Sequence, residues 1–223
     1  MAKAVPVYVE AGDKKVFACS IDFPGWCRSG RTEELALEAL AGYAPRYAEV
    51  AERAKAAFPA PATVRERLEV VERVKGDGAT DFGVPHKIPE ADAEPLTARQ
   101  AARQVELLRA AWAFLDEVAK ASPAELRKGP RGGGRDRDKI LDHVLGAEAN
   151  YARMVGVRHP QPELGDTRAV EALRDELART LGGASDGSPP LPKGWPPRYA
   201  IRRIAWHVLD HAWEMQDRAD PGG

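Results

Sequence analysis

The spacing of hydrophobic residues near the N-terminus predicts a small β-sheet. Residues 5–10 and 15–22 are short runs rich in β-branched and aromatic side chains, and Gly12 and Asp13 between them favour a hairpin turn. Residues 67–75 alternate between apolar and polar side chains, which is typical of a strand with one buried face. We therefore expect three strands that belong to one sheet.

A helix is expected between the second and the third of these strands. Residues 35–57 are rich in Ala, Leu and Glu, and Thr32 just before them is a suitable N-cap. Pro45 lies inside this run and is expected to kink or interrupt the helix, because proline cannot donate a backbone hydrogen bond. The predicted order is β-β-α-β, an α+β arrangement with the helix on one face of the sheet.

A change in composition then divides the chain. Residues 77–96 are dominated by Gly, Pro and acidic residues and show no sustained period of either strands or helices, which is typical of a linker. We therefore predict an α+β domain over residues 1–76, a linker over residues 77–96 and a second domain over residues 97–223.

The second domain is predicted to be an all-α bundle of four helices. Apolar residues recur every three or four positions, as on the buried face of an amphipathic helix. Thr97 is an expected N-cap, and Gln100 is its partner in a capping box. The predicted helices cover residues 97–121, 138–155, 167–181 and 198–218.

Three histidines of this domain are candidate metal ligands. His207 and His211 are four positions apart, so they share one helix face with Cβ atoms about 5–6 Å apart. His143 falls on the apolar stripe of another predicted helix and is expected to point inward. Three neutral imidazoles would leave one coordination position open, as at a catalytic zinc-type site. Spacing alone also allows the alternative that these are ordinary core histidines.

The predicted cofactor is one divalent metal ion. Zn or Ni is favoured, although imidazole nitrogen also suits Cu and Fe. Glu214 shares the helix face of His211 and could accept a hydrogen bond, ligate the metal or act as a base, but a solvated side chain is the favoured interpretation. Arg203, one turn before His207, could bind a substrate carboxylate, although a surface salt bridge is the commoner role. Asn150 is a similar candidate, two turns after His143.

Composition excludes some classes of partner. The formal net charge of −1 argues against a nucleic-acid or membrane-surface binder, which would carry a basic excess. Cys19 and Cys27 lack the spacing of a CxxC metal motif and allow at most one disulfide. No apolar run has the length of a membrane span, and the first residues lack a signal-peptide core. We expect a cytoplasmic protein of a reducing compartment.

The N-terminal part contains a recognisable motif at its strand–helix junction. The residues of this motif are Asp22, Pro24, Gly25, Gly30, Thr32, Glu33 and Glu34, with Leu35 where Ala is usual. It resembles the D-x-P-G-x-x-x-x-G-x-T-x-E-E-A signature of HicB-like domains, which are antitoxin partners of small RNase toxins. The resemblance covers about the first 75 residues. The resemblance implies a HicB-like β-β-α-β fold and, as partner, either another protein or a second copy of the chain. No DNA-binding segment is recognisable.

The C-terminal part resembles the DinB/YfiT-like superfamily of metal-binding bundles. The matching segments are Asp142-His143-Val144, residues 148–151 and residues 204–211. The resemblance implies helices packed up-down-down-up, with His143, His207 and His211 binding a divalent metal. Some members of the superfamily use the metal to activate a low-molecular-weight thiol for transfer or isomerisation, and many others have no assigned activity.

Two classes of function remain open at this point. The first is an enzyme, a metal-dependent thiol S-transferase or hydrolase that acts on a small molecule, with the N-terminal domain used for docking or dimerisation. The second is a non-catalytic, HicB-like binding or antitoxin-type module fused to a bundle with a structural or vestigial metal site. The complete histidine triad favours the enzyme, while the lack of convincing acid and base groups keeps the binding protein open.

Overall fold

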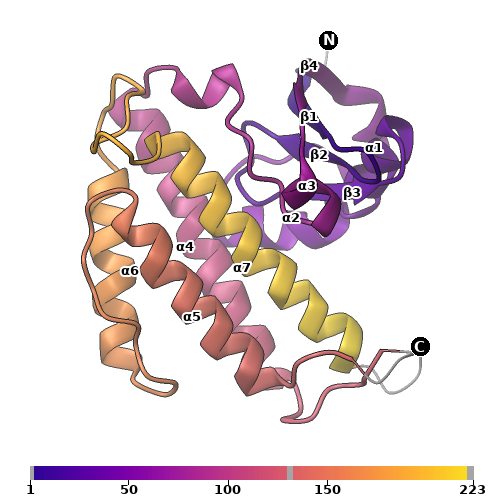
Figure 1. Cartoon of the computed structure of the whole chain (residues 1–223). Coiled ribbons are helices and arrows are strands. Elements are labelled where there is room, and N and C mark those ends of the chain that lie inside the picture. Colours follow the sequence, from indigo (N-terminus) through magenta and orange to yellow (C-terminus); the bar gives the residue numbers. More distant parts are fainter. Residues whose placement is uncertain (1–2, 130–132, 220–223) are drawn as a thin grey trace.

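The computed structural model describes residues 3–129 and 133–219, and their architecture is α+β, as predicted (Figure 1). The described residues contain one four-stranded sheet in the order β3-β2-β1-β4. Its strands are β1 (Val5–Ala11), β2 (Val16–Ser20), β3 (Cys27–Gly30) and β4 (Leu68–Lys75). β1 pairs antiparallel with β2 and parallel with β4, and β2 pairs antiparallel with β3.

Strand β3 was missed by the sequence prediction. Pro24 and Gly25 form a turn that returns the chain alongside β2, so that Cys27 pairs with Cys19. The strand is only four residues long, and its sequence Cys-Arg-Ser-Gly has neither apolar alternation nor β-branched side chains. The observed order begins β-β-β in place of the predicted β-β-α-β, because pairing with β2, and not local propensity, makes this segment a strand.

The helix expected over residues 35–57 is two helices, α1 (Glu33–Gly42) and α2 (Ala44–Arg53). Pro45 lies in the first turn of α2, where its missing N–H costs nothing, so the predicted interruption is confirmed. Thr32 caps α1 by accepting a hydrogen bond from the backbone N–H of Leu35 at 3.2 Å. Two short 3₁₀ turns, η1 (Pro61–Thr63) and η2 (Arg65–Arg67), lead from α2 to β4.

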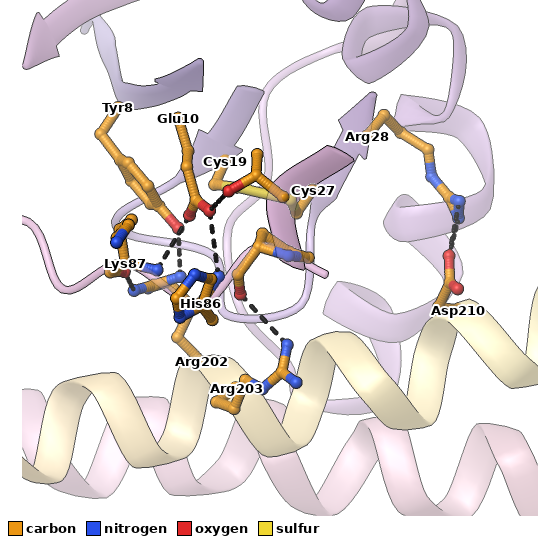
Figure 2. Close-up of a disulfide and its surroundings, with 12 residues drawn as sticks. Tyr8, Glu10, Cys19, Cys27, Arg28, His86, Lys87, Arg202, Arg203 and Asp210 are labelled. Atoms are coloured by element: carbon orange, nitrogen blue, oxygen red, sulfur yellow. Dashed lines mark hydrogen bonds and ion pairs between the residues drawn. A yellow bond between two sulfur atoms is a disulfide. The ribbon is translucent and has the colours of Figure 1, made fainter. Parts of the chain in front are cut away.

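Residues 77–96, predicted to be a linker, are folded against the sheet. They contain helix α3 (Gly78–Phe82) and the 3₁₀ turn η3 (Glu90–Ala93). The fully buried carboxylate of Glu10 on β1 accepts hydrogen bonds from the Thr80 hydroxyl at 2.6 Å and from the backbone N–H groups of His86 and Lys87 at 3.2 and 3.0 Å (Figure 2). A buried carboxylate attracts such donors, and this attraction holds the segment in place despite its irregular sequence.

The long helices lie within two residues of their predicted bounds. They are α4 (Ala98–Ala121), α5 (Arg137–Arg153), α6 (Thr167–Leu181) and α7 (Pro197–Ala219). The capping box is formed as predicted, because Gln100 N–H donates to the Thr97 hydroxyl and the Gln100 side chain accepts from Thr97 N–H. α7 packs along α4 and α5, and α6 packs against α4 (Figure 1).

The sheet also contacts α7 directly. Arg28 on β3 donates both terminal N–H groups to Asp210 on α7 at 3.0 Å (Figure 2). Its guanidinium also stacks on Tyr43 and Trp213. Cys19 and Cys27, both buried, form a disulfide between β2 and β3, which is the single bond that the sequence allows. Disulfides are commoner in oxidising compartments, and a cytoplasmic location stays a prediction. Among the described helices, none combines the length and apolarity needed to cross a membrane.

Gly25 is expected to be intolerant of a side chain. Its φ is +89°, and a Cβ there would lie 2.8 Å from Leu209 Cδ1 and 2.9 Å from the backbone oxygen of Ala205 on α7. Gly25→Ala should lower the free energy of unfolding by about 1–3 kcal/mol, because backbone strain adds to overpacking. Gly42→Ala, whose Cβ would have no heavy atom within 4 Å, is the matched control for urea unfolding. Equal midpoints for the two variants would contradict this packing.

Candidate metal centre

Three histidine side chains from two helices meet at one point. His143 projects from α5, and His207 and His211 project from successive turns of α7. Their nearest ligand atoms all lie within 4.8 Å of one another, and Nε2 of His143 is 3.2 Å from Nε2 of His207. Two nitrogens bound tetrahedrally to one Zn²⁺ at about 2.0–2.1 Å would be about 3.3 Å apart. The triad predicted from sequence spacing is therefore close enough to hold one metal ion.

The environment of the triad favours neutral imidazole rings. His207 is 7% exposed, and burial, together with the nearby rings of His211 and His143, lowers its pKa to about 2. Partial burial and the ring of His211 lower the pKa of His143 as well. A neutral imidazole has a free nitrogen lone pair, which is the form that binds metals. His143 and His207 are thus held in the ligating form at neutral pH.

Glu214 positions the third histidine. Nδ1 of His211 lies 2.8 Å from Glu214 Oε2, and Arg218 donates to Glu214 Oε1 at 2.7 Å. The hydrogen bond with His211 lowers the pKa of Glu214, so the carboxylate is charged and can accept the Nδ1 hydrogen. Nε2 of His211 is then left for a metal. The favoured prediction of a solvated side chain is wrong, and its alternative, an acceptor for a ligand histidine, describes the contact.

His207 lacks a comparable partner. Its Nδ1 atom is buried and has no hydrogen-bond partner within the described residues. Ligand histidines usually donate this second N–H to an acceptor that fixes the ring. The ring of His207 is instead surrounded by aromatic rings, with those of Tyr151 and Trp206 centred 5.7 and 6.1 Å away. Packing therefore replaces a hydrogen bond in orienting His207.

Replacing Glu214 is expected to weaken metal binding. Glu214→Ala should raise the dissociation constant for Zn²⁺ about 10- to 100-fold, because His211 loses the acceptor that fixes its ring. Competition with a chromophoric chelator would measure the change. Glu214→Gln is the matched variant, since an amide oxygen can still accept from Nδ1, and its loss should be smaller. An unchanged affinity in Glu214→Ala would show that the contact does not support the site.

Arg203 is buried, which the sequence prediction did not expect. It is 8% exposed and donates to the backbone oxygen of Pro85 at 3.1 Å and to the Tyr151 hydroxyl at 3.2 Å. Its guanidinium lies 4.6 Å from the centre of the Trp206 ring. The described residues place no carboxylate within ion-pair distance of it, so the interpretation as a surface salt bridge is wrong.

A groove opens beside His143. It has a volume of about 380 Å³, and the residues that line it are Asp142, His143, Gly146, Ala147, Asn150, Tyr151 and Gln161. Gly146 and Ala147 leave space along α5, while the side chain of Gln161 crosses Gly146 and donates to Asp142 Oδ1 at 2.8 Å. Asn150, the exposed residue of α5 predicted above as a candidate, lies in this groove and not against the histidines.

Tyr151 is a site residue that sequence reasoning missed. It lines the groove and contacts both His207 and Arg203. Its position two helical turns after His143 places both on one face of α5, and this spacing could have identified it. His159, by contrast, is not part of the site, since its ring bonds to Glu176 at 2.6 Å.

Comparison of the chain with protein-family models, with curated proteins and with solved structures finds no match, so the geometry of the site carries the functional interpretation.

Proposed function

We propose that the chain binds one divalent metal ion through His143, His207 and His211 and is a metal-dependent enzyme acting on a small molecule. The observation that carries this proposal is the convergence of three imidazoles from α5 and α7 beside a groove. On this proposal, helices α4–α7 form a DinB-like bundle and the reaction is thiol S-transfer or hydrolysis. The N-terminal part, on its HicB-like resemblance, would serve docking or dimerisation.

The ligand set supports Zn or Ni. Imidazole nitrogen is a borderline ligand that suits both ions, and the three histidines contribute no charge. Held by His143, His207 and His211 with one position open, a divalent ion would lower the pKa of water or of a thiol and so would supply a nucleophile at neutral pH.

The surrounding residues would hold this site in place. Glu214 fixes the ring of His211, and the aromatic rings around His207 exclude water from the inner side. The groove offers polar atoms of Asn150 and Gln161 with which a small substrate could form hydrogen bonds. The side of the site around His207 is therefore buried, while the side of His143 is open to a ligand.

Elemental analysis of untagged protein tests the proposal. We expect about one divalent metal per chain in the wild type and almost none in the His143→Ala/His207→Ala variant. Screening of thiol-transfer and ester-hydrolysis substrates should then identify a turnover that is lost in His207→Ala. A wild-type protein that stays metal-free after reconstitution with Zn²⁺ or Ni²⁺ would refute the proposal. The alternative, a binding module, would then be tested by co-purification with a small RNase-like partner.

A further inference from the structure

Two consecutive arginines of α7 differ in how their charge is neutralised. Arg202 is buried and pairs with the buried carboxylate of Asp92, with Nε 3.1 Å from Oδ2. Arg203 is also buried, but the partners found for it in the described part of the chain are neutral, the backbone oxygen of Pro85 and the Tyr151 hydroxyl. Because a buried cation is normally paired, the positive charge of Arg203 is available to an anion brought by a ligand.

Tyr151 connects this charge to the metal centre. Its hydroxyl oxygen accepts from Nη2 of Arg203 at 3.2 Å, and its ring lies 5.7 Å from that of His207. A phenol has one hydrogen to donate, and the described residues provide no acceptor for it. Accepting a hydrogen bond from a guanidinium polarises the O–H bond, so Tyr151 becomes a stronger donor. Tyr151 also lines the groove beside His143.

We propose that this groove binds a small organic acid, with one carboxylate oxygen at the open coordination position of the metal and the other accepting the hydrogen of Tyr151. The proposal rests on the metal-dependent function above and specifies its substrate class. The groove volume of about 380 Å³ suits a small molecule. Tyr151 is then a substrate-binding residue, and Arg203 is a positioning residue that acts through it.

The charges around the groove agree with an anionic ligand. Asp142, the carboxylate in its wall, is engaged by Gln161, and Glu214 is paired with Arg218 and hydrogen-bonded to His211. The positive groups are Arg203, Arg135, whose charge lowers the pKa of His143 and His207, Arg153, which donates to Asn150 of the groove wall, and the divalent ion that the triad would hold. A carboxylate that bridges the ion and Tyr151 would therefore compensate charge that the described protein groups leave unbalanced.

The test uses Co²⁺-loaded protein, whose visible absorption spectrum changes when the open position gains a ligand. Acetate and acetohydroxamate, which binds metal ions as its anion, are the probes, and acetamide is the neutral analogue of acetate. We expect the wild type to bind acetate at least tenfold more tightly than acetamide. In Tyr151→Phe, the dissociation constant of acetohydroxamate should rise roughly 10- to 100-fold, the range for loss of one hydrogen bond to a charged group.

Tyr199→Phe is the matched control. Tyr199 packs on Trp195, as Tyr151 does, but its hydroxyl donates to the backbone oxygen of His86 and is remote from the groove lining. This variant should bind acetohydroxamate like the wild type. Imidazole, a neutral metal ligand, should bind equally to all three proteins and report an intact open position.

The outcomes separate this inference from the proposed function. Normal metal content with unchanged acetohydroxamate binding in Tyr151→Phe would overturn the inference and leave the metal site standing. Equal affinities of the wild type for acetate and acetamide would also overturn the inference that the groove binds an organic acid. This comparison needs only the wild type, so it tests the inference even if Tyr151→Phe does not fold or loses its metal. A wild type without metal would overturn both.

Discussion

Replacing His207 with alanine is expected to abolish stoichiometric metal binding. His207 is the buried member of the triad and lies 3.2 Å from His143 through their Nε2 atoms. Binding energies of about 10–16 kcal/mol for four-ligand zinc sites correspond to roughly 2.5–4 kcal/mol per ligand, so affinity should fall by about two to three orders of magnitude. Calorimetric titration of the metal-free protein with Zn²⁺ would measure the loss.

His159→Ala is the matched control for this experiment. His159 lies outside the triad and bonds to Glu176, so its removal should leave Zn²⁺ affinity unchanged while deleting the same type of side chain. If His207→Ala and His159→Ala bind Zn²⁺ equally well, the triad is not the binding site. The far-ultraviolet circular dichroism of both variants should match that of the wild type, since α7 is held by contacts along its whole length.

Replacing Arg202 with methionine is expected to cause the largest loss of stability. Arg202 and Asp92 are 4% and 1% exposed, and Arg202 also donates to the Tyr8 hydroxyl and to the backbone oxygen of Lys87 (Figure 2). Arg202→Met would leave the carboxylate of Asp92 buried and unpaired, which typically costs about 3–5 kcal/mol. Urea unfolding followed by circular dichroism would measure the change in free energy of unfolding.

Two further variants show whether the buried charge is the cause. Arg109 pairs with Asp175 on the exposed surface, so Arg109→Met should cost no more than about 1 kcal/mol. Arg202→Met/Asp92→Leu removes both charges, and much of the stability should return because no unpaired group stays buried. A double variant as unstable as Arg202→Met would mean that lost packing, and not the unpaired carboxylate, dominates.

These contacts also bear on how the two parts of the chain cooperate. Pro85 and Lys87, in the segment between the sheet and α4, accept hydrogen bonds from Arg203 and Arg202 on α7. Arg203 in turn donates to Tyr151, next to His207. The segment from 77 to 96 therefore connects the sheet to the candidate metal centre, so a variant there can affect the site without touching a ligand.

The sequence by itself determined the elements whose signals are local. The sequence predicted helices α4, α5, α6 and α7, because one face of each helix is buried and its apolar residues recur every three or four positions. The capping box at Thr97 and the helix interruption at Pro45 could also be predicted, because each depends on residues within a few positions of one another. The spacing of His207 and His211 placed both on one face of one helix, whatever the tertiary structure.

Only the tertiary structure decided the contacts between residues far apart in the chain. It made residues 27–30 a strand by pairing them with β2, and it folded residues 77–96 by supplying Glu10 and Arg202 as partners. It also paired Arg202 with Asp92 but left Arg203 with Tyr151 and a backbone oxygen. The sequence could not predict this difference, because the two residues are identical and adjacent. The physical reason is that periodicity and capping act within a few residues, whereas burial and charge pairing depend on which distant groups the fold brings together.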